Sequence, residues 1–526
     1  MTTDFSESQI EIITPPNDSI DKTYSMLENL HEIVSENLPE NEYLWPSSMP
    51  PIIPDDDLIP IANYGDSDEA KEKVEYREYI SKKYGKHKQL ISGIHYNFSF
   101  NSDFLQSLHK NSATDQSFKD FKNDIYLTVA RNLLKHQWLI TYLMGANIAI
   151  HSSYKKCCDI TRYEKGDEYH FKNACSFRNS ICGYRNKEDF RVSYDNIDDN
   201  IKDLKKLIST GQLHGANEYY SPVRLKNPKS INGLDALEKD GIEYIELRMI
   251  DLNPLSKIGI TKDDIYLIHL IIISSLLYPC SSYNKEEQAT AIEKQNLVSL
   301  YGNKLPPHLI EEGLHFFKRM EQHLDDLSQK EFYEKIIKQA IDRINGNREI
   351  YSTMIYNMVD STGYINHHLS VAKHNKKQSS SNKYALKGYE DLELSTQILI
   401  REALLKGLKV EVLDRTENFI SIKNDTKIEY IKQATKTSLD PYSTALIMEN
   451  KAITKKVLMD NNITVPNGGI FTSIDDAKGE YSKFKSKKVV IKPNNTNFGL
   501  GITILDENFS IKDYTNGLEI AFNKVR

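Results

Sequence analysis

Alternating apolar and polar residues predict a β-strand within the stretch 241–254. Its apolar side chains lie at every second position, namely Ile245, Leu247 and Met249. The positions between them carry Tyr244, Glu246 and Arg248. One face of this strand therefore suits a core, and the other offers a carboxylate beside a guanidinium. Such a face can hold a metal ion and clamp a phosphate or carboxylate, although a solvated Glu/Arg pair on a surface strand explains the same pattern.

A second strand with the same alternation is predicted over residues 94–100. Its polar face carries His95, Asn97 and Ser99, and its other face is aliphatic and aromatic. Two strands of this kind favour an antiparallel sheet with one buried and one open face. Two matching polar faces favour a binding site, although a single histidine is more often structural than a ligand.

Helical periodicity of apolar residues accounts for much of the remaining chain up to residue 375. It predicts helices over residues 19–37, 71–84, 265–278, 309–327 and 329–345. The region 124–152 is also expected to be helical, with an interruption near Gly145. The longest apolar runs are shorter than the roughly 20 residues that span a bilayer, which predicts buried helices.

The pattern changes after residue 373. Residues 374–383 carry no large apolar side chain, and we expect a linker over residues 376–390. Beyond it, a helix over 392–406 and strands over 410–413 and 419–423 predict a small α/β module at residues 391–440. A last segment, 441–526, starts with helical patterns. The sequence thus predicts a first domain over residues 1–375 and two smaller parts after the linker.

Composition and charge restrict the function classes. A chain of 526 residues is too long for one core and predicts two or three domains. A formal net charge of −7 gives no general attraction to nucleic acid or to anionic membranes. Five cysteines without a CxxC pair, and a polar start without a signal-peptide pattern, predict a cytoplasmic protein.

Two further groups of residues have the chemistry of a site. Asp4 and Glu11 are seven positions apart, so a helix or a loop would bring them together, although two exposed acids are the simpler explanation of this pair alone. Lys492 ends an apolar strand and precedes a loop with Gly499 and Gly501. An ammonium group beside accessible backbone N–H groups suits a polyphosphate. The loop is not a Walker A sequence, and an ordinary surface turn also explains it.

Longer motifs resemble the bacterial glutamate–cysteine ligases, in the form fused to a glutathione synthetase. In the family's order, they are Thr3-Asp-Phe-Ser-Glu7, Leu44-Trp-Pro-Ser-Ser-Met-Pro50, Ser92-Gly-Ile-His-Tyr-Asn-Phe-Ser99 and Gly241-Ile-Glu-Tyr-Ile-Glu-Leu-Arg248, which Asp251-Leu-Asn-Pro254 follows. Further on, Glu393-Leu-Ser-Thr-Gln397 and Leu446–Lys456 resemble the lead segment and first subdomain of the fused ATP-grasp enzyme. The resemblance therefore implies a pre-ATP-grasp module at residues 391–440 and part of an ATP-grasp domain at 441–526.

The resemblance implies an α+β fold in which an antiparallel sheet curves into a bowl backed by helices, similar to glutamine synthetase. It also implies an ATP-dependent ligation. The γ-carboxylate of glutamate attacks the γ-phosphate of ATP, and the amine of cysteine then displaces phosphate from γ-glutamyl phosphate. Because two anions must approach each other, Mg²⁺ or Mn²⁺ is expected beside ATP.

The resemblance assigns roles to particular residues. Those expected to face the metal ions are Asp4, Glu11, His95 and Glu246. Those expected to stabilise the transferred phosphoryl group are Arg248 and Arg77. Those expected to bind the amino-acid substrates are Arg178 for the glutamate α-carboxylate, Tyr76 and Tyr184 for cysteine, and Asn97 for positioning. Those expected to bind the phosphates of ATP in the last segment are Lys451 and Lys492.

Two departures from the family pattern leave alternatives open. The Gly-Leu-Glu-x-Glu segment that precedes the first motif in the family is not found ahead of Thr3, and Arg526 follows soon after the expected nucleotide loop. We therefore expect a shortened bifunctional enzyme with weakened γ-glutamylcysteine synthesis and without glycine addition. A nucleotide-binding remnant without turnover and a glutamate ligase with another amine acceptor stay open. Small-molecule substrates are the expected partners, and a homodimer stays open.

Overall fold

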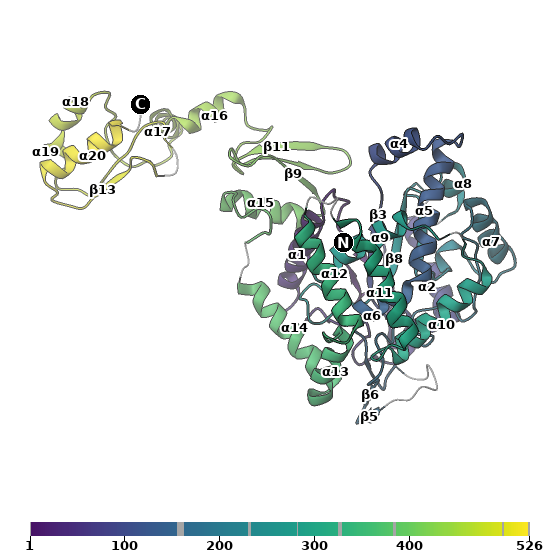
Figure 1. Ribbon diagram of the computed structural model, residues 1–526. Helices are drawn as coiled ribbons and strands as arrows, with labels where there is room; N and C mark the ends of the chain where they lie inside the picture. The colour runs from purple at the N-terminus through teal and green to yellow at the C-terminus, as the bar shows by residue number, and fades with distance from the viewer. Residues whose placement is uncertain are drawn as a thin grey trace. The chain divides into compact units, whose positions relative to one another are not determined.

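The computed structural model describes residues 2–154, 163–229, 233–280, 282–324, 329–381, 385–496 and 499–523. The chain divides into a first unit, Met1–Gly388, and a second unit, Tyr389–Arg526 (Figure 1). All the site residues predicted for the ligase reaction fall in the first unit, and both lysines predicted for the ATP-grasp site fall in the second.

The first unit mixes helices with short strands, which confirms the predicted α+β class. Its strands are β1 (Thr2–Thr3), β2 (Ile10–Glu11), β3 (Ile94–Phe98), β4 (Ala149–His151), β5 (Tyr163–Lys165), β6 (Glu168–His170), β7 (Val223–Lys226) and β8 (Tyr244–Ile250). Its helices are α1 (Ile20–Asn37), α2 (Asp68–Tyr84), α3 (Lys86–Gln89), α4 (Ser102–Asn111), α5 (Phe118–Lys135), α6 (Gln137–Met144), α7 (Ile197–Ser209), α8 (Asp235–Asp240), α9 (Lys262–Leu277), α10 (Lys285–Tyr301), α11 (Pro307–Glu321), α12 (Lys330–Ile344), α13 (Tyr351–Thr362) and α14 (Tyr364–Ser381), with 3₁₀ turns η1 (Asp56–Leu58) and η2 (Ala216–Glu218).

Both strands predicted from alternation lie in one three-stranded antiparallel sheet, in the order β3-β8-β7. Glu246 on β8 lies opposite Asn97 on β3 and opposite Arg224 on β7. Ile245 and Leu247 are fully buried in the main core, as the alternation predicts. The remaining strands of this unit form the sheet β4-β6-β5 and the hairpin β1-β2, so the strands of the unit are grouped in small antiparallel sheets.

Helices cover the apolar face of the β3-β8-β7 sheet. α5 contacts β7 and β8, α6 packs on β8, and α9 packs on α5. Every residue of α6 is buried, which explains why its sequence is apolar all round. The expected helical region 124–152 differs from the structure, because α5 ends at Lys135 and β4 follows α6. None of the helices in the described parts of the chain is long and apolar enough to cross a membrane.

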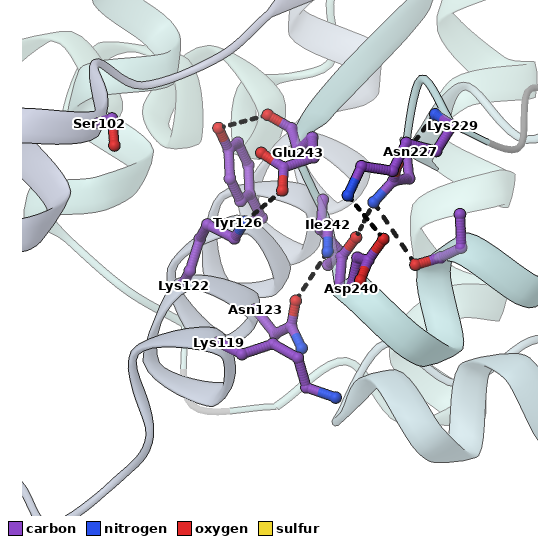
Figure 2. A network of polar contacts seen from close by, with 12 residues as sticks. Ser102, Lys119, Lys122, Asn123, Tyr126, Asn227, Lys229, Asp240, Ile242 and Glu243 are labelled. Atoms are coloured by element: carbon purple, nitrogen blue, oxygen red, sulfur yellow. Dashed lines mark hydrogen bonds and ion pairs between the residues drawn. The ribbon is translucent and has the colours of Figure 1, made fainter.

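A polar network fixes the start of β8 against α5 (Figure 2). The Asn123 Oδ1 atom accepts from the backbone N–H of Ile242 at 2.8 Å, and the Tyr126 hydroxyl donates to the carbonyl of Glu243 at 2.8 Å. Lys122 Nζ lies 2.6 Å from the Glu243 carboxylate. A slip of one residue would turn Glu246 and Arg248 toward the core, because side chains alternate along a strand. The network therefore holds both on the open face.

The carboxylate of Glu168 on β6 holds the N-terminus of α14. It accepts from the backbone N–H of Tyr364 at 2.6 Å and of Ile365 at 3.0 Å, and His170 Nε2 lies 2.9 Å away. Burial raises the pKa of Glu168, but the hydrogen bonds from Ile365 and Tyr364, and then that from His170, hold it below its usual value of 4.5. The charged form therefore stabilises the junction between β6 and α14.

We expect Glu168→Gln to lower the free energy of unfolding by about 1–2 kcal/mol at pH 7. Since the pKa of Glu168 is depressed in the folded state, its contribution is complete above the unfolded pKa of 4.5 and is lost as the pH falls below it. Urea denaturation at several pH values should show the difference between wild type and variant narrowing below pH 4.5. Glu164→Gln, at an exposed position of β5, is the control, and the same pH dependence in both variants would contradict the assignment.

The segment expected to be a linker is partly helical. α14 continues to Ser381, because Lys376 donates to the carbonyl oxygens of Leu38 at 3.3 Å and Glu42 at 2.9 Å, and Ser379 is buried. The expectation of an irregular linker is therefore wrong for residues 376–381, and residues 382–384 lie outside the described residues. The last part of the expected linker contacts α1, since Asn29 Nδ2 donates to the carbonyl of Lys387 at 2.9 Å.

The second unit begins with the predicted helix and two strands, followed by a third strand that the sequence analysis missed. Its elements are α15 (Leu394–Leu405), β9 (Lys409–Asp414), β10 (Phe419–Lys423), β11 (Ile428–Lys432), α16 (Tyr442–Glu449), α17 (Lys451–Asp460), α18 (Ile474–Gly479), α19 (Tyr481–Phe484), β12 (Val489–Ile491), β13 (Thr503–Leu505) and α20 (Ile511–Asn523). The sheet order is β11-β10-β9, and β12 pairs with β13. No residue of α16 or α17 is buried, and Tyr442 and Ile504 are 81% and 72% exposed.

Candidate active site

Glu246 lies at the centre of the open face of the β3-β8-β7 sheet, with its side chain 8% exposed. Arg248 donates to its Oε1 atom, His95 Nδ1 lies 3.5 Å from the same oxygen, and Lys226 Nζ lies 3.8 Å from Oε2. Burial raises the pKa of Glu246, but Arg248 and Arg224, and then His95 and Lys226, lower it to about 2. Glu246 is therefore ionised at neutral pH.

The β1-β2 hairpin brings Asp4 and Glu11 into the field of the same arginines. Arg77 on α2 donates from Nε to the carbonyl of Asp4 at 2.7 Å, and its guanidinium lies 4.4 Å from the ring centre of Tyr64. Desolvation raises the pKa of both carboxyls, and Asp4 raises that of Glu11 further. Arg77 and Arg248 oppose both shifts, so the two carboxylates and the two arginines interact with one another.

His95 is neutral at physiological pH. Desolvation, followed by repulsion from Arg248, lowers its pKa well below 6.5, although Glu246 acts in the opposite sense. Its side chain is 33% exposed, so the ring lies at the edge of the site and not beneath it. A neutral imidazole is the form that binds metal ions.

Of the four predicted metal ligands, His95 lies 3.5 Å from Glu246, and Glu11 lies close enough to Asp4 and Glu246 that both, after desolvation, raise its pKa. Within the described ranges, no three His, Cys, Asp or Glu side chains lie close enough together to form a metal site. The donor set nevertheless fits a divalent cation, because its carboxylate oxygens are ligands that Mg²⁺ prefers. A cation would also relieve the repulsion that raises the pKa of Glu11.

A pocket that opens to solvent lies beside the charged face. Three predicted residues line it, namely Arg178, Tyr184 and Arg248. The lining residues that the sequence analysis missed include Gln137, Asn179, Arg185, Tyr220 and Gln295. Asn179 and Arg185 adjoin the predicted residues Arg178 and Tyr184, whereas Gln137, Tyr220 and Gln295 come from other segments.

Aromatic side chains form one wall of the pocket. The rings of Tyr184 and Tyr220 stack with centres 4.5 Å apart, and the ring of Tyr84 lies 5.6 Å from that of Tyr220. Burial, followed by the nearby Tyr184, raises the pKa of Tyr76. The structure thus brings the predicted residues Tyr76 and Tyr184 close together, with Tyr220 as a third ring.

Cationic side chains outnumber carboxylates around this face. The cations are Arg77, Arg178, Arg224, Arg248 and Lys226, and the carboxylates are Asp4, Glu11, Glu246 and Asp251, which lies beside Arg178. Arg224 and Lys226 lie on β7, and desolvation lowers the pKa of both side chains. Such an excess of positive charge at a partly desolvated site suits anionic substrates.

The two lysines predicted for nucleotide binding lie near each other in the second unit. Lys451, at the start of α17, donates from Nζ to the carbonyl of Asn494 at 3.2 Å and to that of Thr496. Desolvation and then the charge of Lys492 lower its pKa. Gly499 and Gly501 adopt φ values of 76° and 74° in the loop that follows, a conformation that glycine tolerates best.

Comparisons with known proteins agree with this arrangement. The family model "Glutamate-cysteine ligase" matches residues 1–298, and the model "ATP-grasp-like domain" matches residues 390–443. The chain is 42% identical to the Glutathione biosynthesis bifunctional protein GshAB of Clostridium perfringens, over 99% of this chain and 68% of that protein. It is 40% identical to the protein of the same name from Listeria monocytogenes serotype 4b, over 99% of this chain and 69% of that protein.

Solved structures give the same result. The crystal structure of a bifunctional glutathione synthetase from Pasteurella multocida matches with a TM-score of 0.78 and 34% identity, over 99% of this chain and 67% of that chain. A glutamate–cysteine ligase from Francisella tularensis in complex with AMP matches with a TM-score of 0.66 and 27% identity, over 77% of this chain and 86% of that chain. The first family model covers more than half of the chain, and relatives above 30% identity are matched over more than two thirds of their length. The chain therefore belongs to the glutamate–cysteine ligase family, in the bifunctional form that the GshAB proteins represent.

Proposed function

We propose a mechanism by which the first unit carries out the ATP-dependent formation of γ-glutamylcysteine, the reaction of the family to which the chain belongs. The observation that carries the proposal is the meeting of Arg178, Arg248 and Tyr184 at one pocket beside the ionised Glu246. Arg178 suits an α-carboxylate, Arg248 suits a phosphoryl group, and Tyr184 suits an uncharged acceptor.

Arg178 would bind the α-carboxylate of glutamate. Its side chain is buried, and its Nε–H group has no hydrogen-bond partner. A buried donor without a partner is costly, and a substrate carboxylate would satisfy it. Glutamate held in this way extends its γ-carboxylate away from Arg178, toward the charged face on which Arg248 lies.

Arg248 and Arg77 would stabilise the phosphoryl group as it passes from ATP to the γ-carboxylate. Positive side chains aimed at developing charge in a partly desolvated site are the main protein contribution to such transfers. The cysteine amine then attacks the acyl carbon and loses a proton, and phosphate leaves. Asp4, Glu11, His95 and Glu246 would hold Mg²⁺, which neutralises charge between ATP and glutamate, and Asn97 would orient groups beside Glu246.

Tyr184 and Tyr76 would shape the cysteine pocket. We expect Tyr184→Ala to raise the KM for cysteine about 10-fold or more, because it removes one ring of the stacked pair with Tyr220. The KM for glutamate should change much less. Tyr184→Phe, which keeps the ring, is the control, and initial rates at varied cysteine measure both. An unchanged KM for cysteine in Tyr184→Ala would exclude this role.

A coupled assay of phosphate release tests the reaction itself. With ATP and Mg²⁺ present, we expect release to depend on both glutamate and cysteine, and mass spectrometry should detect γ-glutamylcysteine. Binding of ATP without glutamate-dependent release would instead favour a nucleotide-binding protein without turnover. Equal rates with a panel of other amines would favour a different acceptor.

Lys451 and Lys492 would bind phosphates of ATP in the second unit. Their mutual repulsion, seen in the lowered pKa of Lys451, is what a bound polyphosphate relieves. Isothermal titration with ATP should lose one binding event in the double variant Lys451→Met/Lys492→Met while γ-glutamylcysteine synthesis persists. A cytoplasmic location and a homodimer stay predictions from the sequence.

A further inference from the structure

We infer that Gly93 and Asp251 form a socket that fixes the guanidinium of Arg178, so that both are positioning residues for the substrate carboxylate. The inference rests on the proposed role of Arg178 and extends it to two residues outside the set predicted from the sequence. Gly93 precedes β3, and Asp251 follows β8. They therefore approach Arg178 from two adjacent strands of the β3-β8-β7 sheet.

Asp251 forms the charged wall of the socket. It is 1% exposed, and its Oδ2 atom accepts from the backbone N–H of Ala146 at 3.0 Å. Its Oδ1 atom lies 3.7 Å from Arg178 Nη1 and accepts from Asn179 Nδ2 at 3.3 Å. Asn179 in turn accepts from Arg178 Nη1 at 3.3 Å through its Oδ1 atom. The carboxylate is thus fixed on two sides and holds Arg178 directly and through Asn179.

Gly93 forms the other wall by having no side chain. A Cβ atom at this position would lie 2.2 Å from Arg178 Nη2, 2.3 Å from Cζ and 2.5 Å from Nε. The guanidinium therefore rests on the backbone of Gly93. Gly93 is not among the glycines with positive φ, so the space that the guanidinium occupies, and not backbone freedom, accounts for glycine here.

The motif 44–50 ties the two walls together. The carbonyl of Ser48 accepts from the backbone N–H of Ser92 at 2.9 Å, and its hydroxyl oxygen accepts from that of Leu252 at 2.8 Å. Ser48 thus bridges the residue before Gly93 and the residue after Asp251. The next residue, Met49, is anchored in turn, because its carbonyl accepts from the Tyr364 hydroxyl at 2.7 Å. This gives a structural role to a motif to which the proposed mechanism assigns none.

The socket leaves one side of the guanidinium for substrate. Nη2 donates to the carbonyl of Arg248 at 2.6 Å, Nη1 faces Asp251 and Asn179, and Nε has no partner. A shift of the guanidinium would change which donors face the pocket. Because hydrogen bonds depend steeply on distance and angle, such a shift weakens carboxylate binding without altering the groups that contact ATP.

The test is a kinetic comparison of Gly93→Ala, Asp251→Asn and Arg178→Met in the full chain. We expect Arg178→Met to raise the KM for glutamate about 100-fold. Gly93→Ala and Asp251→Asn should each raise it about 10-fold. These increases correspond to the loss of roughly one to two charge-assisted hydrogen bonds. The KM for cysteine should change less than about 3-fold. In Gly93→Ala/Arg178→Met, the glycine substitution should add nothing to the effect of Arg178→Met, because its target is gone.

Two matched controls separate positioning from general damage to the core. Asp264→Asn removes another buried carboxylate, which lies 4.0 Å from Arg343. Gly313→Ala introduces a Cβ atom 3.1 Å from Ile344 Cδ1 and 3.3 Å from Trp138 Cη2 in the helical core. Both should lower the melting temperature and leave the KM for glutamate within about 3-fold of wild type.

The outcomes are distinct. If Arg178→Met leaves the KM for glutamate unchanged, the proposed role of Arg178 fails, and the socket with it. If Arg178→Met raises that KM but Gly93→Ala and Asp251→Asn do no more than the two controls, the socket alone is overturned. Should Asp251→Asn fail to fold, Gly93→Ala decides, because its Cβ atom meets only the movable end of a side chain.

Discussion

Replacement of Arg248 by methionine is expected to lower kcat for glutamate-dependent phosphate release at least about 10³-fold. Arg248 lines the pocket and also pairs with Glu246 on the charged face, and its side chain is 14% exposed. Methionine keeps much of the length and apolar surface of arginine while removing its charge and donors. The loss should appear in kcat more than in the KM for glutamate, because the charge that Arg248 stabilises develops during phosphoryl transfer.

Steady-state kinetics with each substrate varied in turn measures this effect, and circular dichroism checks the fold. Arg415→Met is the matched control, because it removes a guanidinium that pairs with Asp391 at a side chain 49% exposed. This control should retain wild-type kcat. A kcat within 10-fold of wild type in Arg248→Met would remove Arg248 from the phosphoryl-transfer step.

Glu246→Gln is expected to abolish most activity and also to destabilise the first unit. The substitution keeps the shape of the side chain but leaves Arg248, Arg224 and Lys226 without the carboxylate that balances them. Breaking a buried ion pair by removing one partner costs about 3 kcal/mol or more. We expect kcat/KM for ATP to fall at least about 10³-fold, since Glu246 is also a proposed ligand of Mg²⁺.

Chemical denaturation measures the loss of stability, and Mg²⁺ titrations of activity measure the loss of catalysis. Glu243→Gln is a close control on the same segment, because Glu243 pairs with Lys122 at 2.6 Å and its side chain is 44% exposed. Its loss should cost less than about 1 kcal/mol. Equal stability and equal activity of Glu246→Gln and Glu243→Gln would exclude the proposed role of Glu246.

The alternation along β8 was sufficient to predict the face on which Glu246 and Arg248 lie, because the periodicity of a strand allows no other arrangement. It was not sufficient to predict that Arg224 lies opposite Glu246. That pairing depends on the register of β7, which is set by contacts such as that of Asn227 Nδ2 with the carbonyl of Gly241 at 2.8 Å. Register results from tertiary contacts, so a local pattern does not contain it.

The pocket was predicted only in part for the same reason. The family resemblance predicts Arg178 and Tyr184, whereas Tyr220 and Gln295 come from segments without a local signal. The expected linker is partly wrong, because a segment of polar residues can still form a helix. Lys376 forms its hydrogen bonds with residues more than 300 positions earlier, and such contacts stabilise a polar helix that its own sequence does not predict.

The exposed apolar side chains of the second unit determine how the purified chain should behave in solution. Ile504 and Val490, on the paired strands β13 and β12, are 72% and 56% exposed, and short strands of this kind offer unpaired backbone groups for pairing with further molecules. Aggregation of the purified chain, seen as turbidity or as loss of protein on storage, would thus arise from a region that contains none of the ligase residues. Comparisons between variants therefore need turnover expressed per folded monomeric molecule, since total protein would confuse self-association with loss of catalysis.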